Sequence, residues 1–143
     1  MKLTLSYDRR YGQMTIADDS RETVVFHSTV LSYHALDDLA EAVVKLLQMV
    51  TRATCAWAVE SGEHRWILER RGEEVQITIL WFRDSFSNQL DEQGEEEFSA
   101  VCKLRRFAVQ VKNVLQTEID AGSGGAYLPS AYGKLAAALR SEG

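Results

Sequence analysis

The fold is decided by one stretch, Glu60-Ser-Gly-Glu-His-Arg-Trp-Ile-Leu-Glu-Arg-Arg-Gly-Glu-Glu-Val-Gln-Ile-Thr-Ile-Leu-Trp-Phe-Arg83. It predicts a strand, a turn at Ser61-Gly62, a second strand, a turn at Gly72 and a third strand. The third strand alternates polar side chains with an apolar set, Val75, Ile77, Ile79 and Trp81. A period of two over this length is typical of a half-buried antiparallel strand.

Further strands are expected on the N-terminal side of this stretch. Alternation at Leu3, Leu5 and Tyr7 predicts the first, and Met14 and Ile16 belong to the second. The segment from Thr23 to Leu31 is rich in β-branched residues and apolar on both faces, which indicates a strand covered on both sides. The later strands are expected over Thr54 to Glu60, Arg65 to Arg71 and Glu74 to Phe82.

Two long helices are predicted from apolar residues at three- and four-residue steps. The first runs from about Ala35 to Arg52, and the second from about Glu95 to Ala121. Three glutamates in the expected first turn of the second helix suit the helix dipole. Gly122 fits a left-handed C-terminal cap, and Ser130 can cap a last short helix over Ala131 to Arg140.

The pattern predicts a single α+β domain over residues 1–143. We expect one antiparallel sheet of about six strands in βββα-βββα order, with both long helices packed on one face and a short C-terminal helix. Its core should unite the apolar face of the third strand with the stripe of the long helix. The set expected to be buried together is Ile77, Ile79, Trp81, Leu104, Ala108, Val111 and Leu115.

The composition excludes some classes of protein. The formal charge of -5 argues against a basic nucleic-acid binder. The segment from Met1 to Asp8 lacks the apolar run of a signal peptide, and no apolar stretch approaches the roughly 20 residues that span a bilayer. These features predict a soluble cytoplasmic protein without a membrane partner. Cys55 and Cys102 have apolar neighbours and are expected to be small buried hydrophobes.

Motifs for chemistry are weak. His27, His34 and His64 do not pair with one another or with cysteine at metal-ligand spacing. Glu60, Ser61 and His64 crowd one tight turn, where a nucleophile, a base and an orienting acid cannot align. The glycines at 122, 124 and 125 follow a helix, whereas a phosphate-binding loop follows a strand. We therefore expect no catalytic residue, no metal and no cofactor. We also expect that the protein is not an enzyme.

A candidate partner-binding surface lies after the third strand of the opening stretch. Aromatic residues there could anchor a partner, and an acidic run could steer a basic one. The candidate residues are Phe82, Arg83, Asp84, Phe86, Asp91, Glu92, Glu95, Glu96 and Glu97. The alternative interpretation is a solvated loop followed by a solvated helix start. The basic patch of Lys103, Arg105 and Arg106 is expected to be a solvated helix face.

The hairpin from Glu60, the Arg-Arg-Gly-Glu-Glu turn, the Leu-Trp-Phe-Arg-Asp segment and Gly-Gly-Ala-Tyr near the end resemble a group of small bacterial proteins. These are mostly uncharacterised, and some are thought to act as immunity partners in toxin systems. The resemblance covers roughly Trp57 to Leu139. It implies a protein-binding function and no catalytic residues.

The leading hypothesis is a non-enzymatic cytoplasmic domain that binds another protein, as an immunity or adaptor protein. The first alternative is a small-molecule binding module, or a minor enzyme, with a pocket between sheet and helices. The second alternative is a homo-oligomeric structural protein. A cleft with converging polar side chains would favour the first alternative, and a large apolar surface patch would favour a protein partner or an oligomer.

Overall fold

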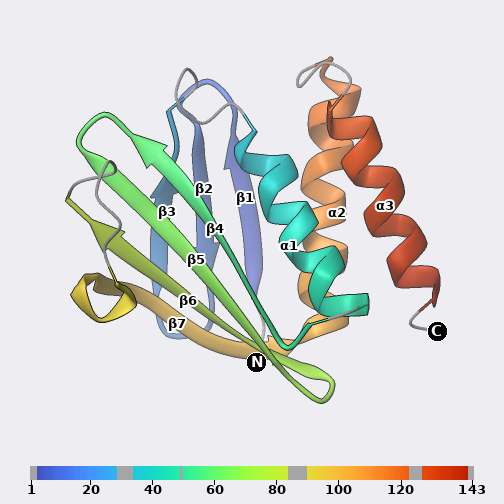
Figure 1. Ribbon diagram of the computed structural model, residues 1–143. Coiled ribbons are helices and arrows are strands. Elements are labelled where there is room, and N and C mark those ends of the chain that lie inside the picture. Colours follow the sequence, from blue (N-terminus) through green and yellow to red (C-terminus); the bar gives the residue numbers. More distant parts are fainter. Residues whose placement is uncertain (1–2, 29–33, 49, 84–89, 123–126, 142–143) are drawn as a thin grey trace.

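The structure is a computed structural model that describes residues 3–28, 34–48, 50–83, 90–122 and 127–141. Its α+β class is the predicted one (Figure 1). In chain order the elements are β1 (Thr4–Asp8), β2 (Gln13–Ala17), β3 (Glu22–Phe26), α1 (Ala35–Gln48), β4 (Arg52–Val59), β5 (Gly62–Arg71), β6 (Glu74–Phe82), the 3-10 turn η1 (Asp91–Gln93), β7 (Glu95–Lys103), α2 (Leu104–Asp120) and α3 (Tyr127–Ser141).

The strands form two antiparallel sheets, so the expectation of one six-stranded sheet is wrong. The order is β1-β2-β3 in one sheet and β4-β5-β6-β7 in the other. Contacts at β3 join the sheets: the Thr23 hydroxyl donates to the Glu97 carbonyl, and just beyond the strand the Ser28 N–H donates to the Ala58 carbonyl at 2.7 Å. Figure 1 shows the four-stranded sheet crossing in front of the three-stranded one.

The segment from Glu95 to Lys103 is strand β7, which corrects the prediction that it begins the long helix. Phe98, Ala100 and Cys102 are buried and pair with Ile79, Ile77 and Val75 of β6. The physical reason is that β5 pairs with only one edge of β6. The backbone N–H and C=O groups on the other edge need hydrogen-bond partners, and β7 supplies them. Helix α2 therefore begins at Leu104 and has 17 residues, a length of about 26 Å.

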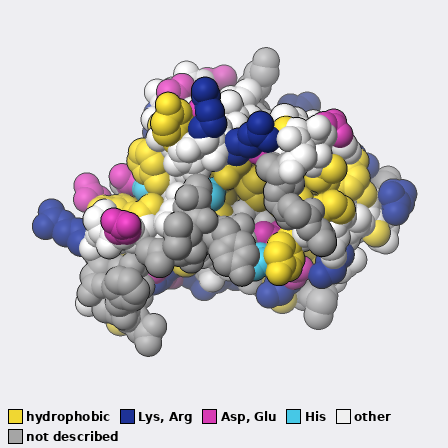
Figure 2. Space-filling model, turned by 90° about the horizontal axis from the view of Figure 1, so that it is seen from above, with side chains coloured by type: hydrophobic (Ala, Val, Ile, Leu, Met, Phe, Trp, Pro, Cys, Tyr) yellow, Lys and Arg dark blue, Asp and Glu magenta, His cyan; other side chains and the backbone are white. Residues whose placement is uncertain are grey.

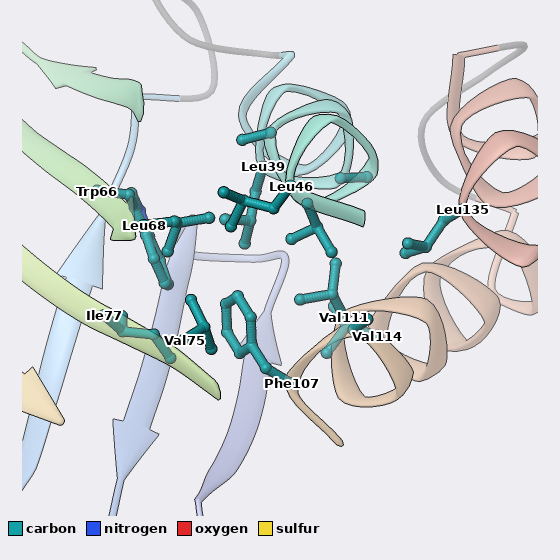
Figure 3. Close-up of a cluster of buried hydrophobic side chains, with 14 of the residues drawn as sticks. Leu39, Leu46, Trp66, Leu68, Val75, Ile77, Phe107, Val111, Val114 and Leu135 are labelled. Carbon is teal, nitrogen blue, oxygen red and sulfur yellow. The ribbon is translucent and has the colours of Figure 1, made fainter. Parts of the chain in front are cut away.

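The helices close one side of the two sheets and do not both lie on one face of a single sheet. Helix α1 packs on β4 and β5, α2 packs on β1 and on the ends of β6 and β7, and α3 lies across α1 and α2. The main core fills the space between sheets and helices (Figure 3). All the residues expected to share it are buried except Trp81, which is half-buried at the end of β6.

The C-terminal region differs from the prediction in one respect. Helix α3 begins at Tyr127, so Ser130 lies inside it and does not cap it. Pro129 falls in the first turn, where its missing N–H has no intrahelical acceptor in any case. Gly122 has φ +80° and its N–H donates to the Ile119 carbonyl, which confirms the left-handed cap of α2.

Neither cysteine forms a disulfide, and both have weakly reactive surroundings. Cys102 is buried, and burial raises the pKa of its thiol to about 11. Cys55 is half-exposed as a residue, yet desolvation also raises the pKa of its thiol. A thiol with a raised pKa holds little thiolate, the nucleophilic form, at neutral pH. Within the described segments, none of the helices combines the length and apolarity needed to cross a membrane.

Candidate functional site

The predicted partner-binding residues lie at the end of β6, in η1 and at the start of β7. Arg83 is exposed and directly follows β6. Asp84 and Phe86 lie outside the described residues. The described chain resumes at Leu90, and η1 leads directly into β7.

Phe82 is buried, contrary to its expected role as an anchor for a partner. It is 1% exposed and forms a small cluster with Ile67 and Leu80, separate from the main core. The Arg65 guanidinium lies 4.1 Å from the centre of its ring. On the other side, a Cβ at Gly94 would lie 2.6 Å from the ring, so only glycine allows this approach. Phe82 therefore supports the segment from within and does not reach a partner.

Asp91 is fixed by two arginines of the four-stranded sheet. Its carboxylate accepts hydrogen bonds from Arg52 of β4 and from Arg65 of β5, the latter at 2.8 Å. Arg65 also pairs with Glu63, which is 8% exposed. These pairs hold η1 against the sheet, so the position of the segment after it is well defined.

Three carboxylates of the predicted set are exposed without a partner among the described residues. Glu92, Glu95 and Glu96 are exposed, and among the described residues none of them has an ion pair or a side-chain hydrogen bond. Glu95 and Glu96 stand opposite Trp81 and Leu80 on β6. We call these three residues the acidic edge. Glu95 and Glu96 lie in strand β7, not in the helix that the sequence predicted, and Glu92 lies in the turn η1.

Glu97 is turned away from the acidic edge by a β-bulge. The register shifts between Ile79, which faces Phe98, and Leu80, which faces Glu96, so Glu97 is the extra residue. Its carboxylate lies 2.8 Å from Nε2 of His64, a residue that is only 3% exposed. Nδ1 of the same ring lies 3.1 Å from the Phe26 nitrogen and 3.3 Å from the Phe26 carbonyl oxygen. With the ring proton on Nε2, Nδ1 accepts from the Phe26 N–H and Nε2–H donates to Glu97.

His27 joins β1 to the four-stranded sheet in a similar way. Its Nδ1–H donates to the Ser28 carbonyl at 3.0 Å, and the Tyr7 hydroxyl donates to Nε2 at 2.6 Å. The ring also meets Trp57 edge-on at 5.2 Å. His27 is therefore a packed and hydrogen-bonded residue of the interior. The pairing of His64 with Glu97 was not predicted, because it joins residues 33 positions apart.

Both buried histidines have their two ring nitrogens occupied, which limits what they can do chemically. Burial lowers the pKa of His27, and it lowers the pKa of His64 despite the nearby Glu97 carboxylate. Burial also raises the pKa of Tyr7 to about 12. His34 lies apart, bonded to Asp37. Across the described residues, no three side chains of the metal-binding types come together.

These pKa shifts predict a loss of stability in mild acid. Well above pH 6.5 both histidines are neutral in the folded and unfolded chains, and this stabilisation is fully present. As the pH falls below 6.5, both histidines become protonated in the unfolded chain but remain neutral in the folded chain. The free energy of unfolding should then fall by up to about 1.4 kcal/mol per pH unit for each histidine, until the folded-state pKa is reached.

Urea denaturation between pH 7.5 and pH 5 at fixed ionic strength measures this slope. The double variant His27→Asn with His64→Gln removes both titrating rings and should have a much flatter profile. A slope equal to that of the unchanged protein would show that the two histidines are not its source.

Comparison of the chain with protein-family models, with curated proteins and with solved structures gave no significant match.

Proposed function

We propose that this protein is a non-enzymatic, cytoplasmic protein-binding domain, an immunity or adaptor protein whose partner presents a basic surface. The observation that carries the proposal is the acidic edge. Its three carboxylates are exposed and unpaired among the described residues, at one end of the four-stranded sheet. The whole chain, these glutamates included, has a formal charge of -5.

Rigid support favours binding at this edge. The two arginine pairs of Asp91 and the burial of Phe82 fix the backbone on which the glutamates stand. A surface that is already ordered loses less conformational entropy when a partner binds. Binding residues also concentrate on short segments held by a rigid scaffold.

The charge pattern sets how such a partner would associate. Exposed carboxylates attract a basic surface over about one Debye length, roughly 10 Å at 0.1 M salt. This attraction raises the association rate more than it lowers the dissociation rate. Arg83 is exposed next to the acidic edge and could contact an acidic or aromatic group at the rim of the same interface.

The buried polar groups support a role without catalysis. A general base needs a nitrogen or oxygen that can reach a substrate. In the described structure the rings of His27 and His64 have both nitrogens bonded within the protein. Their contacts tie the two sheets together, which is a structural role.

Charge reversal at the acidic edge tests the proposal. The variant Glu92→Lys, Glu95→Lys, Glu96→Lys should reduce the association rate with the native partner by about tenfold or more, since rim charges act mainly on this rate. The partner is isolated from the native host with the unchanged protein as bait, and surface plasmon resonance then measures its rates at two salt concentrations.

The matched control is Glu73→Lys, Glu74→Lys, Asp120→Lys. It changes the net charge equally, but its residues are exposed at the β5–β6 turn and at the end of α2. The control should bind nearly as fast as the unchanged protein. Equal association rates for the two triple variants would contradict a site at the acidic edge.

A further inference from the structure

A second feature lies at the opposite ends of β6 and β7, where β7 passes into α2. A half-open cavity of about 830 Å³ is bounded there by the start of β1, the end of β7, the first two turns of α2 and the turn after β5. Its volume is within the range of about 300–1,000 Å³ that is usual for small-molecule sites. Apolar lining comes from residues that include Leu3, Leu47 and Val109.

The cavity is basic although the protein is acidic. Its lining holds four cationic side chains, Arg70, Lys103, Arg105 and Arg106, against one carboxylate, Glu73. The formal balance is +3 in a chain whose total is -5. Like charges gathered in one concave site repel one another, and a bound anion would remove that cost.

Two of the four cations are held in place by helix ends. Arg70 donates to the Gly72 carbonyl and to the Leu46 carbonyl at the end of α1, both at 2.8 Å. Arg105 donates to the Leu139 carbonyl near the end of α3 at 3.0 Å. Cations suit helix C-termini, so these two residues have a structural reason to be there. Their guanidinium groups are also ordered before any ligand arrives.

Lys103 and Arg106 have no comparable structural role. The Lys103 ammonium is 3.8 Å from Glu73, and both side chains are largely exposed. Arg106 is exposed and has no hydrogen bond or ion pair within the described parts of the chain. Both flank the N-terminus of α2, where the dipole already favours negative charge and disfavours cations. Their presence at the cavity is explained if a negatively charged ligand binds there and neutralises them.

We infer that this cavity binds a small organic phosphate. The phosphoryl oxygens contact Arg106 and Lys103, with the ordered Arg105 beside them, and the apolar part of the ligand lies toward Leu3, Leu47 and Val109. A phosphate has enough acceptor oxygens for several cations, and guanidinium groups bind it in a bidentate way. This site is separate from the acidic edge and does not depend on the proposed protein partner.

The test uses phenyl phosphate as the organic probe and inorganic phosphate as the head group alone. Titration of the full chain, followed by backbone amide NMR, should give saturable shifts at Arg105, Arg106 and Phe107. Phenyl phosphate should bind more tightly than inorganic phosphate, because only the former has an apolar part. Both affinities should fall as salt rises.

Arg106→Ala should weaken phenyl phosphate binding by about tenfold or more, the effect of losing one charge-assisted contact. The matched control is Lys112→Ala, which removes a positive charge from the same helix at a position that does not line the cavity. It should leave the affinity nearly unchanged.

Three results would overturn the inference. One is the absence of saturable shifts up to about 10 mM of phenyl phosphate, since a dissociation constant above that concentration is too weak for a functional site. Another is equal affinity in Arg106→Ala and Lys112→Ala. The third is tighter binding of a short single-stranded oligonucleotide than of phenyl phosphate at the same residues, which would assign the phosphate to a nucleic acid.

Discussion

Replacing Phe107 with alanine should lower the free energy of unfolding by about 3–5 kcal/mol. Phe107 is completely buried at the centre of the main core. Figure 3 shows its ring extending from α2 toward Val75 of β6, with side chains of α1 above it. Side chains of β6, α1 and α2 surround the ring, so these elements cannot collapse into the space without separating elsewhere. The loss therefore includes both the transfer of the ring and the cavity that remains.

Urea denaturation at pH 7.5 measures this change. Leu115→Ala, a second fully buried site on α2, should cost about 2–5 kcal/mol. The control is Asn113→Ala on the exposed side of the same helix, which should change stability by less than about 0.5 kcal/mol. Losses under about 1 kcal/mol at both Phe107 and Leu115 would mean that this face of α2 is not packed as described.

The strands around the opening stretch were predictable because their signals are local. The alternation from Val75 to Ile79 and the turn at Gly72 need only neighbouring residues to be read. Gly72 has φ +63° at the first position of a two-residue loop, a conformation that favours glycine. The registers of β5 and β6 follow from that short turn, since it fixes which residues face each other.

Strand β7 was missed because two periodicities overlap in its sequence. Val101 continues the helical step of Leu104 and Ala108, yet it is 40% exposed on the strand. The alternation of Phe98, Ala100 and Cys102 with Ser99 and Lys103 was the signal for a strand. The strand is selected by a tertiary contact: one edge of β6 pairs with β5, and β7 pairs with the other.

The division into two sheets could not be inferred from local patterns. It depends on contacts such as Phe26 with His64 and Thr23 with Glu97, which join residues 38 and 74 positions apart. The sequence showed that Thr23 to Leu31 was apolar on both sides, but not what covered it. The strand itself ends at Phe26.

The sequence predicted the exposed acidic residues of the candidate site, but not the burial of its aromatic residue Phe82. The exposure of Glu92, Glu95 and Glu96 follows from their polarity alone. The burial of Phe82 depends on Gly94, twelve residues later, and on the stacking of Arg65. A sequence window around Phe82 shows an aromatic beside charges, which is equally typical of an interface anchor.

Gly62→Ala should destabilise the fold by at least about 2 kcal/mol, because there is no room for one added methyl group. Gly62 opens β5 and pairs with Val59 across the β4–β5 turn. An added Cβ would lie 2.1 Å from the Phe82 carbonyl oxygen and 2.7 Å from the Trp81 ring. The ring could rotate, but the carbonyl belongs to the backbone of β6. Relief therefore requires the ends of β5 and β6 to move apart.

The φ of Gly62 is not positive, so the expected loss reflects steric crowding and not backbone strain. The matched control is Gly133→Ala in α3, where a Cβ would have no neighbour within 4 Å. That change should stabilise the protein by about 0.5–1 kcal/mol, since alanine favours a helix interior more than glycine does. Denaturation of both variants under one set of conditions gives the comparison. If Gly62→Ala were as stable as the unchanged protein, the close approach of β5 to the Phe82 carbonyl would be contradicted, and with it the position of the strand end that supports the acidic edge.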